Sequence, residues 1–223
     1  MPSGPALIVM ARAPRLGVGK SRLREVLSDN ERLRLQEAFL RDTVDMASNA
    51  NIGRVYLAVT PPGATAWAQS EFGAGVTTLA QPGGDLGQRM LNAMREAASE
   101  RHGPVIVIGT DTPLLATAHL HAALQSLDSA DVCFGPSDDG GYYLVASNEP
   151  QASIFQDVAW GTDQVLKTSL ALARDAGLKC ALLDELYDVD TPDDLARLVA
   201  DLRSAGEATT RHTRQVLLQT AVS

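Results

Sequence analysis

Three loops carry residue types that bind phosphates or metal ions. Lys20 ends a loop containing glycine and proline, between an apolar run at 6–10 and a helical segment. A lysine and backbone N–H groups at a helix start can hold phosphate oxygens. Asp111 follows the apolar run 105–109, and alternation points Asp188 and Asp190 the same way if their segment is extended. Because carboxylates and phosphates are magnesium ligands, we expect Asp111, Asp188 and Asp190 to hold Mg²⁺ (or Mn²⁺).

The loop before Lys20 approaches the phosphate-loop pattern G-x-x-x-x-G-K-[ST] without matching it. Gly17-Val18-Gly19-Lys20-Ser21 supplies the end of the pattern, but Pro14 stands where its first glycine belongs. Proline fixes φ near −65° and has no N–H, so it suits neither the turn nor the phosphate cradle. We therefore expect a more general basic phosphate-binding loop. An ordinary basic surface loop is the alternative.

Two further segments carry candidate substrate-binding residues. In Asp138-Asp139-Gly140-Gly141-Tyr142, Asp139 can accept hydrogen bonds from sugar-like hydroxyls and Tyr142 can stack on a ligand. The two glycines let the backbone approach that ligand. Trp160 precedes a predicted helix cap and is a candidate ligand platform. The alternatives are a tight turn between strands and a tryptophan that closes a loop over the core.

Composition narrows the class of protein. The chain has 223 residues and a net charge of −8, which excludes a general nucleic-acid binder. No apolar run approaches the roughly 20 residues of a membrane helix, and the run at 6–11 is too short for a signal-peptide core. Cys133 and Cys180 form neither a disulfide framework nor a metal cluster. We therefore expect a cytoplasmic protein.

Charge is unevenly distributed along the chain. Residues 1–24 hold five basic side chains and no acidic one, whereas residues 184–201 hold seven acidic side chains and one basic, Arg197. These two segments could meet at a polyphosphate and its metal ion, or they could be solvated charge on two unrelated faces.

Strand-like and helical segments alternate along most of the chain. Apolar runs at 6–10, 54–60, 105–109 and 132–136 have strand length, and capping patterns at Ser28, Asp85 and Thr191 mark helix starts. This order predicts an α/β protein with helices on both faces of a mostly parallel sheet. Ligands of such sheets bind at the carboxyl ends of the strands. We expect one domain over 1–203 and a tail over 204–223, whose Val216-Leu217-Leu218 could dock on a second copy in a homodimer.

Six motifs in order resemble one bacterial family. They are Ala11-Arg-Ala-Pro-Arg-Leu-Gly-Val-Gly-Lys-Ser-Arg-Leu23, Gly84-Asp-Leu-Gly-Gln-Arg-Met90, Ile108-Gly-Thr-Asp-Thr-Pro-Leu-Leu115, Gly135-Pro-Ser-Asp-Asp-Gly-Gly-Tyr-Tyr-Leu144, Trp160-Gly-Thr-Asp163 and Asp188-Val-Asp-Thr-Pro-Asp-Asp-Leu195. Over about residues 5–200 the chain resembles the radical-SAM- and selenodomain-associated transferases, often labelled arsenosugar-biosynthesis glycosyltransferases. More distantly it is similar to 2-phospho-lactate guanylyltransferase. Both belong to the nucleotide-diphospho-sugar transferase superfamily, with the three-layer, Rossmann-like GT-A fold.

The resemblance implies roles for individual residues. The implied nucleotide-binding residues are Ala11, Arg12, Lys20, Gly84, Asp85, Arg89 and Asp111. The implied substrate-binding residues are Asp139, Gly140, Gly141, Tyr142, Trp160 and Thr162. Asp111 matches the superfamily's metal-binding aspartate, and Asp188 or Asp190 the later acidic ligand. For catalysis we expect Asp139 to orient a substrate and Asp163 to deprotonate an acceptor hydroxyl.

Three functions follow from this set of residues. The first is Mg²⁺-dependent glycosyl transfer from a sugar nucleotide to a small-molecule acceptor. The second is nucleotidyl transfer, which joins an NTP to a phosphorylated small molecule. The third is a catalytically silent nucleotide-binding module. None of the three requires nucleic acid or a membrane span.

Overall fold

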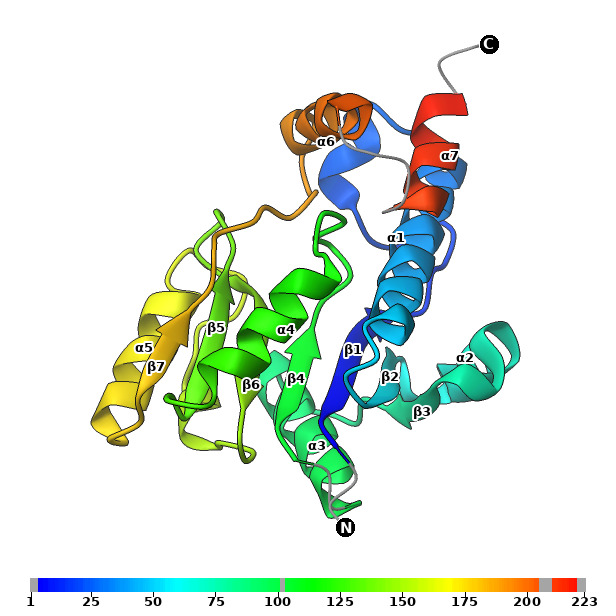
Figure 1. The fold of residues 1–223 in the computed structure, drawn as a ribbon. Coiled ribbons are helices and arrows are strands. Elements are labelled where there is room, and N and C mark those ends of the chain that lie inside the picture. Colours follow the sequence, from blue (N-terminus) through cyan, green and yellow to red (C-terminus); the bar gives the residue numbers. More distant parts are fainter. Residues whose placement is uncertain (1–3, 101–102, 205–209, 220–223) are drawn as a thin grey trace.

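The described residues form a mixed α/β structure around a seven-stranded sheet. The structure is a computed structural model that describes residues 4–100, 103–204 and 210–219. The strand order is β3-β2-β1-β4-β6-β5-β7, and β6 alone in this sheet runs antiparallel to its neighbours. Figure 1 shows the parallel strands ending at one edge of the sheet. The predicted fold class, with a mostly parallel mixed sheet, is confirmed.

The elements alternate along the chain as the apolar runs and capping residues predict. The strands are β1 Ala6–Arg12, β2 Arg54–Thr60, β3 Thr77–Ala80, β4 Val105–Ile108, β5 Val132–Pro136, β6 Tyr142–Ser147 and β7 Cys180–Leu182. The helices are α1 Asp29–Asn49, α2 Thr65–Phe72, α3 Leu86–Ser99, α4 Thr117–Ser126, α5 Val165–Asp175, α6 Pro192–Ser204 and α7 Arg211–Gln219. Short 3-10 helices lie at η1 Ser21–Glu25, η2 Pro62–Ala64, η3 Gly73–Gly75 and η4 Ser153–Phe155.

Helices cover both faces of the sheet, and alternate residues of each central strand face opposite cores. Leu7 and Val9 of β1 point to the core under α1, α2 and α4, whereas Ala6 and Ile8 point to the core under α3 and α5. Burial on both faces explains why β1 and β4 are continuous apolar runs rather than alternating ones. The sheet is therefore a rigid base for the loops at its carboxyl edge.

A third apolar cluster lies beyond the carboxyl ends of the strands. Leu23 of η1 and Phe39 of α1 pack there with Val189, which precedes α6, and with Leu198 of α6. In Figure 1, α6, η1 and α7 stand above the top of the sheet. This cluster holds the first basic loop and the later acidic segment against each other.

The segment proposed for docking on a second copy packs within its own chain. The Asp42 carboxylate on α1 accepts hydrogen bonds from the backbone N–H groups of His212 and Thr213, at 2.9 and 2.8 Å, and so caps α7. Val216 and Leu217 pack against the third cluster. These side chains stay half-buried, and a homodimer stays a prediction. Residues 205–209 and 220–223 of the predicted tail lie outside the described residues.

Capping side chains start the helices that flank the site. Ser28 and Glu31 form the predicted capping box of α1, Asp85 accepts the Gln88 N–H at 2.8 Å, and Asp194 exchanges hydrogen bonds with Thr191. After Lys20, however, only the single 3-10 turn of η1 forms. One turn aligns few peptide dipoles, so a helix N-terminus contributes little there.

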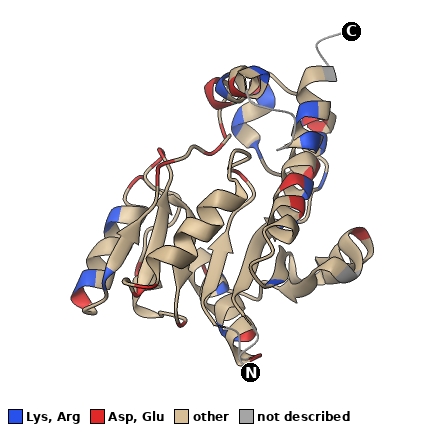
Figure 2. Ribbon diagram, viewed as in Figure 1, with Lys and Arg blue, Asp and Glu red and all other residues tan. Residues whose placement is uncertain are grey.

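Basic and acidic side chains gather at the same end of the molecule. Figure 2 shows lysine and arginine on η1 and acidic residues on the segment that leads into α6, both beyond the carboxyl edge of the sheet. Of the two alternatives for these segments, the contacts described below show that they meet, through Lys20 and Asp190; a polyphosphate and a metal ion between them stay a prediction. None of the described helices is long and apolar enough to cross a membrane.

A substitution at Gly87 tests the packing of the loop before α5 on α3. A Cβ at Gly87 would lie 2.5 Å from Trp160 Cζ2 and 3.1 Å from the Phe155 carbonyl oxygen. Gly87→Ala should therefore lower the free energy of unfolding by about 1–2 kcal/mol, because overpacking outweighs the gain of about 1 kcal/mol from helix propensity. Urea denaturation measures this change. In the Gly87→Ala background, Trp160→Ala should lower the free energy of unfolding by less than it does in the parent. If the two losses are additive, the contact with Trp160 does not cause the effect of Gly87→Ala.

Candidate active site

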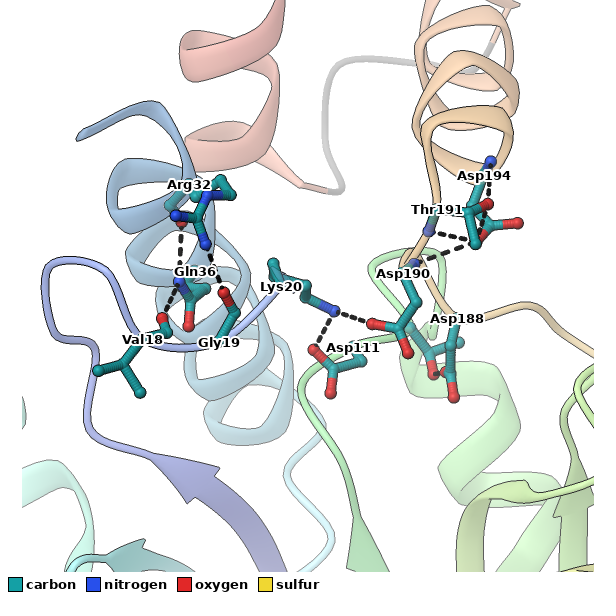
Figure 3. Close-up of polar contacts among 11 residues, drawn as sticks. Val18, Gly19, Lys20, Arg32, Gln36, Asp111, Asp188, Asp190, Thr191 and Asp194 are labelled. Carbon is teal, nitrogen blue, oxygen red and sulfur yellow. Dashed lines mark hydrogen bonds and ion pairs between the residues drawn. The ribbon is translucent and has the colours of Figure 1, made fainter. Parts of the chain in front are cut away.

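Lys20 and two aspartates form the centre of the candidate site. The Lys20 ammonium makes ion pairs with Asp111 and Asp190, the latter at 2.9 Å (Figure 3). The lysine side chain is only 5% exposed, whereas the two carboxylates are 53% and 47% exposed. Burial by itself would lower the Lys20 pKa, but the two carboxylates outweigh it and the net shift is upward. The ammonium is therefore held charged at the edge of a cavity.

The loop that presents Lys20 has an unusual backbone. Lys20 itself lies in the left-handed region, with φ 44° and ψ 44°, and Gly19 has a φ of 77°. Side chains with a Cβ adopt this region at a cost of about 1 kcal/mol or more, and such strain concentrates at functional sites. A Cβ at Gly19 would also lie 2.2 Å from Gln36 Oε1. The turn therefore requires glycine before the lysine.

Helix α1 holds this loop from behind. Arg32 Nη1 donates to the Gly19 carbonyl at 2.8 Å, and Gln36 Nε2 donates to the Val18 carbonyl at 2.9 Å. Arg32 is 1% exposed and pairs with Asp29. Figure 3 shows both side chains reaching from one face of α1 toward the loop. These contacts fix the main chain, so that the Lys20 side chain has a defined origin.

The acidic segment before α6 is fixed to the loop after β4. The Val189 N–H donates to the Asp111 carbonyl at 2.9 Å, and Thr112 Oγ1 donates to Asp188 Oδ1. Asp194 Oδ2 accepts hydrogen bonds from the backbone N–H groups of Asp190 and Thr191. Hydrogen bonds from Thr191 and Asp190 outweigh burial and lower the pKa of Asp194. Asp194 thus caps α6 and leaves Asp190 free to face Lys20.

Two adjoining cavities open at this point. The first, of about 440 Å³, is lined by Arg12, Lys20, Asp111 and Asp190 together with Gln36 and Phe39. The second, of about 290 Å³, is lined by Asp111, Asp139, Asp188, Tyr142 and Trp160 among others. Met10, Thr110 and Asp111 line both cavities. Two ligands that occupy them would therefore meet beside Asp111.

The second cavity has an aromatic and acidic wall. The Tyr142 and Trp160 rings meet edge to face, with centroids 6.2 Å apart, and the Trp160 indole N–H is buried without a hydrogen-bond partner among the described residues. Asp139 accepts the Gly141 N–H at 2.8 Å. Burial, together with the charges of Asp111 and Asp139, raises the pKa of Asp188 to about 6. Gly141 and Thr162 also line this cavity.

Several sequence-predicted residues serve as supports. Ala11 is buried, and its carbonyl accepts a hydrogen bond from Gln81. Gly140, with a φ of 86°, lets its loop pack on the backbone of Asp163, where a Cβ would lie 2.2 Å from the Asp163 carbonyl oxygen. The exposed Asp163 carboxylate contacts Gln164 and does not line either cavity. Its role as a base stays a prediction without a contact to support it.

Besides Ala11, three predicted nucleotide-binding residues lie outside the two cavities. The Asp85 carboxylate caps α3, Arg89 Nε donates back to the Asp85 carbonyl at 3.2 Å, and Gly84 takes a positive φ of 67° before the cap. Asp85 lines a separate cavity of about 350 Å³ with residues of α3 and the η4 region. These residues shape the start of α3.

Sequence reasoning missed the residues that position Lys20. Arg32 and Gln36 lie four residues apart on α1, and Arg32 shares a helical face with the buried Leu35 and Phe39. A charged residue on the apolar face of a helix was the available signal. It identifies Arg32 as a buried group without revealing its partner, because Gly19 is brought to it only by the fold.

The carboxylates fit a hard divalent cation in chemistry, although no metal site is preformed. Among the residues that the structure describes, no group of three or more His, Cys, Asp or Glu side chains is placed to hold a metal ion. Magnesium takes one or two protein carboxylates together with phosphate oxygens and water. Asp111 and Asp190 converge on one point, where the Lys20 ammonium now lies. A cation bound through the two oxygens that pair with Lys20 would have to displace that ammonium.

The raised pKa of Asp188 predicts a pH-dependent stability. Its folded value of about 6 exceeds the unfolded value of about 4. Protonation therefore favours the folded state, and this stabilisation is complete below pH 4 and lost as the pH rises through 6. Asp188→Asn should raise the free energy of unfolding by about 2 kcal/mol at pH 8 and leave it nearly unchanged at pH 4. Urea denaturation in the presence of EDTA measures the free energy of unfolding at both pH values. Asp163→Asn serves as the exposed control; an equal gain from Asp188→Asn at both pH values would contradict the assignment.

Comparisons with known proteins identify the family of this chain. Residues 43–162 match the model of a family described as uncharacterised proteins conserved in bacteria, DUF2064. The chain is 32% identical to a 3-phospho-D-glycerate guanylyltransferase of Phenylobacterium zucineum, over 82% of this chain and 85% of the relative. It is 29% identical to a 2-phospho-L-lactate guanylyltransferase of Methanosarcina acetivorans, over 81% of this chain and 80% of the relative.

A solved structure shows the same architecture over nearly the whole chain. A Desulfovibrio desulfuricans protein described as a nucleotide-diphospho-sugar transferase superposes with a TM-score of 0.89 and 26% identity, covering 98% of this chain and 95% of that one. The predictions of a transferase and of this fold are confirmed, whereas the radical-SAM association stays a prediction. Because the family match spans more than half of the chain, and the Phenylobacterium relative aligns with most of both sequences, the chain belongs to the DUF2064 family, with homologues named guanylyltransferases.

Proposed function

We propose that this protein is a nucleotidyltransferase that joins a nucleoside triphosphate to a phosphorylated small molecule and releases pyrophosphate. The observation that carries the proposal is the buried Lys20 ammonium, held on a strained backbone at the edge of the 440 Å³ cavity. The names of the guanylyltransferase relatives support this chemistry and favour GTP as the nucleotide.

Lys20 and Arg12 would bind the phosphate oxygens. Both line the first cavity, which lies at the carboxyl end of β1. Fixed cations stabilise charge most effectively where water is excluded and no reorganisation is needed. The Arg32 and Gln36 contacts with the loop supply that fixed position. These groups would offset the negative charge that develops on the leaving pyrophosphate.

The second cavity would hold the acceptor. It adjoins the first at Asp111, so an acceptor placed there faces the innermost phosphate of the nucleotide. Its described lining holds three carboxylates and neither lysine nor arginine. The charge of an anionic acceptor would therefore be met from the neighbouring cavity, by Lys20 and Arg12. Asp139 and Asp188 would accept hydrogen bonds from acceptor hydroxyls.

Asp111 and Asp190 would hold Mg²⁺ or Mn²⁺, with Asp188 as a third oxygen donor nearby. The ion, when bound, supplies neutralisation of phosphate charge. The chain's own residues keep three tasks: Lys20 and Arg12 bind phosphate, the second-cavity residues orient the acceptor, and the packed aromatic wall of Tyr142 and Trp160 limits the entry of water.

Glycosyl transfer is the second candidate, favoured by one observation. The Desulfovibrio protein that superposes over 98% of this chain is described as a nucleotide-diphospho-sugar transferase. The Tyr142 and Trp160 rings and Asp139 suit the apolar face and hydroxyls of a sugar. In this reaction the first cavity would hold the diphosphate of the donor, and the nucleoside diphosphate would be released instead of pyrophosphate.

The released product distinguishes these functions. Each NTP, with Mg²⁺ and with either 3-phospho-D-glycerate or 2-phospholactate, is assayed for pyrophosphate, and each sugar nucleotide is assayed for nucleoside diphosphate. We expect pyrophosphate from GTP and a phospho-acid. Release of nucleoside diphosphate would establish glycosyl transfer, and tight nucleotide binding with neither product would indicate a silent binding module.

Lys20→Met tests the role of the ammonium in binding. Loss of a charge-assisted hydrogen bond of about 2 kcal/mol should weaken nucleotide binding about thirtyfold. Calorimetric titration with GTP measures this loss. Lys167→Met, at an exposed position of α5, is the matched control and should bind as the parent does. Equal affinity of the Lys20 variant and the parent would remove Lys20 from the phosphate site.

A further inference from the structure

The ammonium of Lys20 occupies the point where two metal-type ligands converge. Its Nζ atom pairs with one carboxylate oxygen of Asp111 and one of Asp190. Figure 3 shows the side chain pointing between these two residues, which come from the loop after β4 and from the segment before α6. A cation bound through these same two oxygens would have to take the place of this ammonium.

We infer that Lys20 and a divalent cation compete for the Asp111–Asp190 pair, and that the phosphates of a nucleotide resolve the competition by drawing the ammonium away. Metal and nucleotide then bind cooperatively, and neither alone binds as well as both together. The role given to the nucleotide phosphates rests on the proposed function. The competition between Lys20 and the cation rests only on the two ion pairs.

Charge balance is the first argument for competition. The described lining of the two cavities contains four carboxylates, those of Asp111, Asp139, Asp188 and Asp190, against two cationic side chains, those of Arg12 and Lys20. Without the ammonium, the carboxylates of Asp111 and Asp190 would attract a divalent cation more strongly, because no neighbouring positive charge would offset theirs.

The local geometry is the second argument. The main chain at Lys20 is fixed from α1 by Arg32 and Gln36, so the loop need not move. The lysine stem has four rotatable carbons, and its ammonium borders the 440 Å³ cavity that Arg12 also lines. A swing of this side chain toward phosphates in that cavity would release both carboxylates at once.

Linkage makes the inference quantitative. If the nucleotide raises the metal affinity by some factor, the metal must raise the nucleotide affinity by the same factor. A protein whose lysine has been replaced by a neutral side chain needs no nucleotide to free its carboxylates. Its metal affinity should therefore be high already without nucleotide, and the cooperative factor should be smaller than in the parent.

In the test, the whole chain is titrated with Mn²⁺ in the absence of nucleotide. Electron paramagnetic resonance measures the concentration of free Mn²⁺ at each step. We expect Lys20→Met to bind Mn²⁺ at least tenfold more tightly than the parent. Arg12→Met is the matched control: it removes a cation from the same cavity that is not paired with Asp111 or Asp190. It should change the Mn²⁺ affinity less than threefold.

Further variants keep the test decisive. Adding Asp190→Asn to Lys20→Met should abolish the gain in Mn²⁺ affinity, and Lys20→Gln should reproduce the gain if the methionine variant does not fold. Circular dichroism monitors folding. Unchanged or weaker Mn²⁺ binding in folded Lys20 variants, or an equal gain in Arg12→Met, overturns the inference.

The same titration repeated with GTP separates this inference from the proposed function. In the parent, GTP should raise the Mn²⁺ affinity at least tenfold, beyond the known binding of Mn²⁺ by free GTP. If GTP binds but Lys20→Met gains no Mn²⁺ affinity, competition is wrong and the function stands. If Lys20→Met gains affinity but no nucleotide binds the parent, competition is correct and the proposed function fails.

Discussion

One buried positive charge organises the carboxyl edge of this sheet. The Lys20 ammonium ties the loop after β1 to Asp111 after β4 and to Asp190 before α6. These three segments are far apart in the sequence, and together they bring Gly19, Lys20, Thr110, Asp111 and Asp190 to the lining of the first cavity. A buried charge is stable only when it is paired, so the Lys20 ammonium needs these two carboxylates or another anion beside it.

Helix α1 has two roles that depend on each other. Its apolar residues Leu40 and Val44 pack on the sheet, while Arg32, Leu35 and Phe39 face the region beyond the strands. Arg32 and Gln36 then use the position fixed by this packing to hold the carbonyls of Gly19 and Val18. The unfavourable backbone at Lys20 persists because these contacts and the packing beneath them overdetermine it.

The two cavities differ in the side chains that line them. This difference suits the binding of two different substrates in the proposed reaction. The first has the cationic side chains and the second has the aromatic wall with Asp139 and Asp188. Glycines make the second cavity possible at two points: Gly87 lets Trp160 lie on α3, and Gly140 lets the turn after β5 pack on the loop before α5. The shared wall at Asp111 brings the reacting groups together.

The class of fold and the types of residue at the site could be predicted from the amino-acid sequence. Buried strands appear as continuous apolar runs and helix starts as capping boxes, because burial and capping are local requirements that each segment must meet. Lys20, Asp111 and Asp190 follow from residue type and from their positions at element ends. Tertiary structure alone decided that Lys20 lies between the two aspartates, that Arg32 supports Gly19, that Asp85 and Arg89 lie outside the two main cavities, and that α7 packs on α1 of its own chain. Those contacts join residues distant in sequence, and no local pattern encodes such distances.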